Sequence, residues 1–188
     1  MNKKYELTEE FIEFCGRKLY RIKALRDFGN VKTGDIGGFI EKEFNLSHEF
    51  DCWIYHEAKV FDNAQVLGDA KVGDNAQVFG DAIVSEKAQV FGDVQVMDSA
   101  KVFGDVQVFE DAQVGDYALV SGNAQIFGEA QIGGLAQVFG NAQVFGKTQI
   151  FEEAHVFDNA IVFGNTKIYG NAKVGGTIQV LSNTIVIN

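Results

Sequence analysis

Proline is absent from all 188 residues, and cysteine, methionine and tryptophan are scarce. A chain without proline can donate a hydrogen bond from every backbone amide, which suits strands that pair with neighbours on both sides. The two cysteines, Cys15 and Cys52, lie far apart in the sequence and fit no metal-ligand spacing. We expect both to be reduced thiols in a cytoplasmic protein, with Cys52 at a buried position.

The chain also lacks a long apolar run and, beyond residue 51, any arginine. No stretch is long enough to span a membrane, and the first ten residues, MNKKYELTEE, lack the apolar core of a signal peptide. Residues 52–188 contain seven lysines and sixteen acidic residues. Binding of nucleic acid needs a basic surface, so we expect neither nucleic acid nor a membrane as a partner.

One six-residue repeat dominates the chain and runs without interruption over residues 58–183. The first copy is AKVFDN, and AQVLGD, AKVGDN and AQVFGD follow. The third position is always Val or Ile, and the first is Ala in most copies. Positions 1 to 3 alternate apolar and polar residues, as a short strand does, while Gly, Asn and Asp at positions 4 to 6 favour a turn. The repeat therefore predicts a solenoid of about seven coils, each made of three strands and three turns.

The hexads VGDNAQ (72–77) and IGGLAQ (132–137) resemble those of the hexapeptide-repeat family, whose fold is the left-handed parallel β-helix. The resemblance implies an all-β solenoid of that handedness over residues 52–188. Residues 1–51 lack the repeat, and we expect them to form a small β cap that covers the edge of the first coil. Two β segments, KYELT and KLYRIKAL, flank a turn at Cys15 and Gly16, and GNVKTGDIGGF is predicted to be a glycine-rich loop.

The run GDIGGFIEKEFNLSHEFDCWIYHEAKV leads into the solenoid and is similar to the corresponding region of uncharacterised YdcK-like putative transferases of bacteria and prophages. This resemblance implies a bacterial or bacteriophage source. It brings no established reaction with it.

Known enzymes of the hexapeptide-repeat family are mostly acyltransferases that use coenzyme A. The resemblance implies a trimer with a catalytic histidine between subunits and a loop that interrupts the repeats, but no loop interrupts this repeat. His155, at outward position 2, is the best candidate base, because His48 precedes the solenoid and His56 falls in a turn. Position 2 also accepts any polar residue, and no metal cluster or Ser/His/Asp arrangement is recognisable.

Aromatic residues recur every eighteen residues at position 4. One such series is Phe91, Phe109, Phe127, Phe145 and Phe163, followed by Leu181. In a solenoid these rings stack over their own turns, and they also form an apolar stripe that can bind a partner. Glutamines at position 2 form two parallel ladders, beginning at Gln89 and at Gln77, whose amides can bond along the axis.

The last hexads differ from the others in composition. Ile178 replaces the small residue at position 1, where we expect it to fill the interior. Leu181, Ile185 and Ile187 occupy corner or outward positions, and such a cluster of apolar side chains predicts an oligomer interface, most simply of a two-fold dimer.

These observations together favour a rigid, non-enzymatic interaction protein that needs no cofactor and forms a homo-oligomer. It would bind or inhibit a host protein through a flat face and its aromatic corner. Two alternatives remain open. One is a coenzyme A-dependent acyltransferase with a site between subunits. The other is an acidic mimic of nucleic acid, because all sixteen acidic residues of 52–188 fall at positions 5 or 6, where the chain turns.

Overall fold

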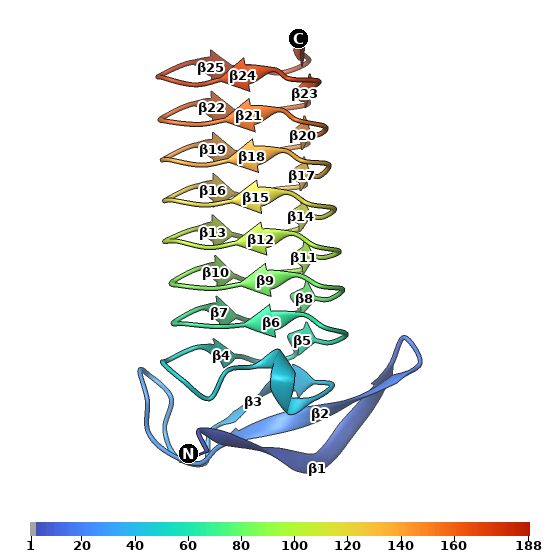
Figure 1. Ribbon diagram of the computed structural model, residues 1–188, viewed down its shortest axis with the longest axis vertical. Coiled ribbons are helices and arrows are strands. Elements are labelled where there is room, and N and C mark those ends of the chain that lie inside the picture. The colour runs from blue at the N-terminus through green and yellow to red at the C-terminus, as the bar shows by residue number, and fades with distance from the viewer. Residues whose placement is uncertain (1–2) are drawn as a thin grey trace.

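The computed structural model describes residues 3–188 and shows a tall stack of three-sided coils standing on a small β cap (Figure 1). Strands of successive coils pair in parallel, and each residue faces the one eighteen positions further along, as Gln107 faces Gln89 and Gln125. The prediction of an all-β solenoid of parallel stacked coils is therefore confirmed. The stack has about eight turns rather than seven, because Trp53 and Ile54 already form a side of the first coil.

Each of the three faces of the solenoid is a parallel sheet of very short strands. The first face contains β5 (Lys59–Val60), β8 (Gln77–Val78), β11 (Gln95–Val96), β14 (Gln113–Val114), β17 (Gln131–Ile132), β20 (Gln149–Ile150), β23 (Lys167–Tyr169) and β26 (Ile185–Ile187). The second face contains β6 (Gln65–Val66), β9 (Ile83–Val84), β12 (Lys101–Val102), β15 (Leu119–Val120), β18 (Gln137–Val138), β21 (His155–Val156) and β24 (Lys173–Val174). The third face contains β4 (Trp53–Ile54), β7 (Lys71–Val72), β10 (Gln89–Val90), β13 (Gln107–Val108), β16 (Gln125–Ile126), β19 (Gln143–Val144), β22 (Ile161–Val162) and β25 (Gln179–Val180).

The interior is filled by the side chains of positions 1 and 3. From Ala58 to Val174 these residues are at most 3% exposed, and the alanines leave room for the larger Val and Ile side chains. Thr148 and Thr166 stand at position 1 in place of Ala, and their hydroxyls donate to the carbonyls of Phe145 (2.7 Å) and Phe163 (2.8 Å). The two polar side chains are therefore buried with their hydrogen bonds made.

The turns depend on one backbone conformation. Every position 5 from Asp62 to Gly176 has a positive φ, whether the residue is Gly, Asp or Glu. Glycine adopts this left-handed conformation readily, whereas an L side chain costs about 1–2 kcal/mol there. Glu110, with φ 63°, occupies it nonetheless. The corners therefore contain acidic residues at a backbone position where intrinsic preference favours glycine or asparagine.

The cap is an antiparallel hairpin that continues the first face. Strands β1 (Tyr5–Phe14) and β2 (Arg17–Ala24) turn at Cys15 and Gly16, as predicted, although β1 is longer than expected. Strand β3 (Ile36–Ile40) pairs antiparallel with β2 and parallel with β5, and the short 3-10 helix η1 (Glu43–Asn45) follows it. The cap strands and the first face thus form one sheet of eleven strands.

The prediction that residues 29–39 form a loop is wrong for the last four of them, because β3 begins at Ile36. The glycines that suggested a loop serve close packing instead. A Cβ atom on Gly37 would lie 2.6 Å from the carbonyl oxygen of Ile54, and one on Gly38 would lie 2.5 Å from the carbonyl oxygen of Ala58. Only glycine allows β3 to approach the first coil this closely. The division into a cap of 1–51 and a solenoid of 52–188 remains a prediction, and β3 links the two parts.

Val108 tests the assigned register. Its side chain is fully buried in the middle of the stack, whereas Gln107, one residue earlier, points outward. Val108→Asp places an unpaired charge in an apolar interior and should lower the free energy of unfolding by several kcal/mol, and Gln107→Asp by under about 1 kcal/mol. Thermal unfolding followed by circular dichroism measures both. Equal melting temperatures for the two variants would refute the register.

Candidate binding surfaces

Phe91, Phe109, Phe127, Phe145 and Phe163 form one column along the corner between the third and first faces, and we call them the phenylalanine column. All five side chains are half-buried. The rings of Phe127 and Phe145 stack with centroids 4.8 Å apart, and those of Phe145 and Phe163 with centroids 5.1 Å apart. The rings therefore cover their own turns and remain partly exposed to solvent. The column can thus stabilise the turns and also contact a partner.

Glutamine side chains line the two faces that meet at this corner. On the third face Gln125 donates to Gln107 and Gln143 donates to Gln125, each over 3.2 Å. On the first face Gln149 donates to Gln131 over 3.1 Å. For these pairs the predicted bonding of stacked amides is confirmed. The faces beside the phenylalanine column are thus lined by polar side chains, and amide hydrogen bonds hold part of each glutamine ladder in place.

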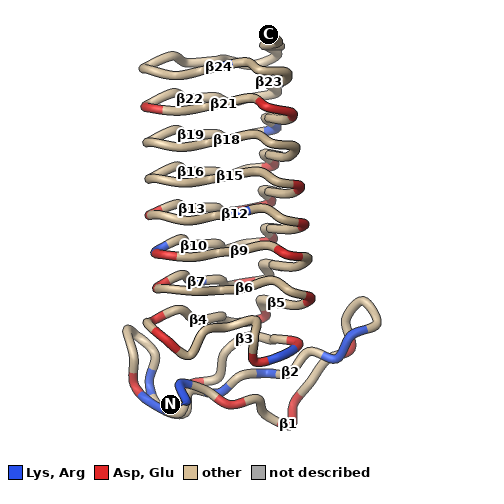
Figure 2. Tube along the Cα trace, viewed as in Figure 1, with Lys and Arg blue, Asp and Glu red and all other residues tan. Residues whose placement is uncertain are grey.

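The sixteen acidic residues of 52–188 lie along the corners of the solenoid, and nine of the sixteen basic residues of the chain lie in the cap (Figure 2). At position 5, seven carboxylates accept a hydrogen bond from the backbone N–H of the residue eighteen positions later. Glu110 accepts from Gly128 in this way over 2.7 Å, and Asp158 accepts from Gly176 over 3.0 Å. A charged acceptor for a backbone amide is worth more than a neutral one, which offsets the strain of the left-handed turn. These seven acids therefore have a structural role.

His155, the candidate base, lies half-buried on β21, in register with Gln137 and Lys173. Its ring meets the edge of Phe139, with centroids 6.4 Å apart, and in the described part of the chain no carboxylate orients its imidazole. His48 lies in the cap, where its Nδ1 accepts from the N–H of Lys4 over 3.2 Å and burial lowers its pKa. The structure does not bring the histidines together into one site.

Apolar side chains are exposed on the last coil. Leu181 is 52% exposed, Ile185 64% and Ile187 71%. Ile178 is 52% exposed, so the prediction that it fills the interior is not confirmed. These residues remain a predicted oligomer interface.

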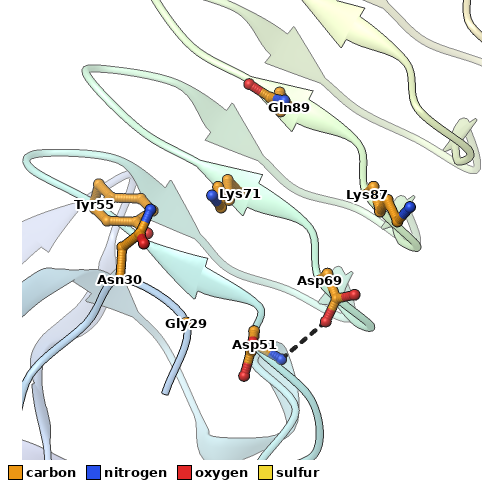
Figure 3. A pocket seen from close by; sticks show the side chains of 8 residues that line it. All are labelled: Gly29, Asn30, Asp51, Tyr55, Asp69, Lys71, Lys87 and Gln89. Atoms are coloured by element: carbon orange, nitrogen blue, oxygen red, sulfur yellow. Dashed lines mark hydrogen bonds between the residues drawn. The ribbon is translucent and has the colours of Figure 1, made fainter. Parts of the chain in front are cut away.

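A hollow of about 310 Å³ lies where a loop of the cap meets the third face (Figure 3). It is lined by Gly29, Asn30, Asp51, Tyr55, Asp69, Lys71, Lys87 and Gln89. The backbone N–H of Asp51 donates to Asp69 over 3.2 Å, and Lys71 and Lys87 add positive charge nearby. Sequence reasoning missed this hollow because it depends on how a loop folds back, for which the sequence has no periodic signal.

A second feature that sequence reasoning missed is a buried lysine beneath the solenoid. Lys4 is fully buried, and its ammonium donates to the carbonyl oxygen of Cys52 over 2.8 Å and lies 3.2 Å from the Cys52 sulfur. Burial lowers the pKa of Lys4 and raises the pKa of Cys52. The contact links the residue just before β1 to the first coil. Both cysteines of the chain are free thiols.

Among the described residues, no three His, Cys, Asp or Glu side chains gather in an arrangement that would hold a metal ion. The same part of the chain has no helix with both the length and the apolar character of a transmembrane segment.

The stacked parallel coils and their six-residue sequence period define a β-solenoid of the hexapeptide-repeat type, as the sequence predicted. The chain is 38% identical over 76 residues to a protein of Escherichia coli (strain K12) described as "Uncharacterized acetyltransferase YdcK". The similar stretch is 36% of this chain and 23% of that protein, so the match spans about a quarter of the relative. No protein-family profile matches the chain.

Proposed function

We propose that this chain is a non-enzymatic binding protein whose contact surface is the phenylalanine column together with the glutamine faces beside it. The observation that carries the proposal is the column itself. Five half-buried rings in a line present partly exposed apolar surface between two faces lined by glutamine side chains. Aromatic edges framed by polar groups are typical of protein interfaces, where the rings supply most of the binding energy.

The first partner we propose is a second copy of the chain. Stacking of Phe91 with Phe109, and of Phe145 with Phe127 and Phe163, holds the rings in place before binding, so association orders few side chains and costs little entropy. The column is straight and repeats every coil, so it can lie against the same column of another molecule about a two-fold axis. A host protein as partner, and a bacteriophage source, stay predictions from the resemblance of the sequence.

Phe127→Gln tests the column, and Phe139→Gln is its matched control. Phe139 also stands at position 4 with a half-buried ring, stacked on Phe157 at 5.3 Å, but it lies on a different corner. Both variants lose a stacked ring pair worth about 1 kcal/mol, so their melting temperatures should fall alike. Sedimentation at micromolar concentration should show a wild-type dimer. Phe127→Gln should raise its dissociation constant by about tenfold or more, and Phe139→Gln should leave it unchanged.

Two outcomes contradict the proposal: a wild-type monomer, or the same dissociation constant in both variants. The double variant Ile185→Lys/Ile187→Lys examines the last coil in the same assay. Loss of the dimer in that variant alone would move the interface from the column to Leu181, Ile185 and Ile187.

Acyl transfer is the second candidate, and the description of the Escherichia coli relative as an acetyltransferase favours it. His155 would be the base, because it is the histidine that stands on a face of the solenoid. The acidic mimic is less favoured than either, because seven corner carboxylates already hold backbone amides.

Calorimetric titration with acetyl-coenzyme A separates the first two candidates. We expect no saturable heat. We also expect no acetyl transfer, because the imidazole of His155 has no carboxylate to orient it in the described chain. Saturable binding, together with acetyl transfer to an amine or hydroxyl that disappears in His155→Ala, would overturn the binding-protein proposal.

A further inference from the structure

The corner between the first and second faces has its own column of position-4 side chains, and this column is interrupted in the middle. Its members are Phe61, Phe79, Met97, Gly115, Gly133, Phe151 and Tyr169. The two glycines follow each other in consecutive coils, between Met97 on one side and Phe151 on the other.

A single glycine in such a column leaves no gap, because a neighbouring ring covers it. A Cβ atom on Gly73 would lie 2.4 Å from the Phe91 ring, and one on Gly175 would lie 2.4 Å from the Phe157 ring. At the interruption Phe151 covers Gly133 in the same way, at 2.7 Å. The nearest neighbours of a Cβ atom on Gly115 would be the flexible Met97 side chain, at 3.1 Å, and the Asp98 carboxylate, at 3.2 Å. Two successive glycines thus leave space that one ring cannot fill.

The space is a hollow of about 220 Å³, which we call the corner hollow. Ile132, 2% exposed, lies in its wall with Met97 and Phe151, and the carboxylates of Asp98 and Asp116 add negative charge. A neighbouring hollow of about 400 Å³ shares these two carboxylates. Among the described residues that line either hollow there is no lysine or arginine.

Both carboxylates are fixed by the corner hydrogen bonds. Asp98 Oδ2 accepts the N–H of Asp116 over 3.0 Å, and Asp116 Oδ2 accepts the N–H of Gly134 over 2.7 Å. In the described chain the Oδ1 atom of each has no protein hydrogen-bond donor, so one oxygen of each carboxylate is available to a ligand. The hollow therefore combines an apolar wall with pre-positioned negative charge.

We propose that the corner hollow binds the side chain of a lysine presented by a partner protein. The four-carbon stem of lysine fits against Met97 and over Gly115 and Gly133, and its compact ammonium meets the two carboxylates and the ring of Phe151. The charge of the solenoid, seven lysines against sixteen acidic residues, attracts a basic partner to this surface. This proposal does not depend on the phenylalanine column.

The test uses two small probes on the intact protein, N-acetyl-lysine amide and the uncharged N-acetyl-norleucine amide. Chemical shifts of backbone amides in the ¹⁵N-labelled protein report binding at Gly115, Gly133 and Gly134. We expect saturable shifts at these residues with the lysine probe, and at least about tenfold weaker binding of the norleucine probe.

Variants assign the binding to the hollow. Gly115→Phe continues the ring column into the space and should abolish the shifts. The double variant Asp98→Asn/Asp116→Asn keeps an acceptor oxygen and tolerates the left-handed turn, so it should weaken only the lysine probe, by about tenfold. Asp158→Asn changes the same kind of carboxylate on another corner and should have no effect.

Equal binding of the two probes would overturn the proposal, and so would lysine shifts that persist in Gly115→Phe or that fall equally in Asp158→Asn. If Gly115→Phe does not fold, the comparison of the two asparagine variants decides the question alone.

Discussion

The pairing of each residue with the residue eighteen positions later is the constraint on which the rest of this structure depends. It requires three sharp turns per coil. In each turn the residue at position 5 of the six-residue repeat adopts a left-handed backbone conformation. The next coil approaches so closely there that a Cβ atom on Gly92 would lie 2.7 Å from the carbonyl oxygen of Glu110. Glycine relieves that contact, and acidic residues in other coils offset their strain by accepting a backbone amide from the next coil.

Because backbone pairing fixes the turns, the corners can vary in what they display. One corner shows the phenylalanine column, whose rings stabilise their turns and offer apolar edges. Another corner contains the corner hollow, where Gly115 and Gly133 replace aromatic side chains and the carboxylates of Asp98 and Asp116 line the space. The same six-residue unit thus produces an aromatic surface and an acidic hollow without a change in fold. We propose that both act in binding other proteins.

Periodicity explains what could be predicted from the sequence. The burial of Val108, the stacking of Phe127 on Phe145 and the amide ladder through Gln125 all follow from the periods of two and eighteen residues. The rest lacks such a period. Gly37 and Gly38 favour a loop in the sequence, although they lie in strand β3. The contact of Lys4 with Cys52 joins two residues that no local sequence pattern relates. The sequence does contain an indication of the corner hollow, because Gly115 and Gly133, eighteen residues apart, interrupt a series of large side chains at position 4. The depth of the hollow depends on side-chain packing, which the sequence pattern does not predict.

Hydrogen exchange at the Gly128 amide tests most directly whether the corner carboxylates hold the turns of the coils. The amide donates to Glu110, which has a left-handed backbone, whereas the neighbouring Asp111 makes no such hydrogen bond in the described chain. Glu110→Gly removes the acceptor and keeps the turn, so the Gly128 amide should exchange about tenfold faster or more than in the wild type. Asp111→Gly should leave that rate unchanged. An equal rate of exchange in both variants would contradict the account.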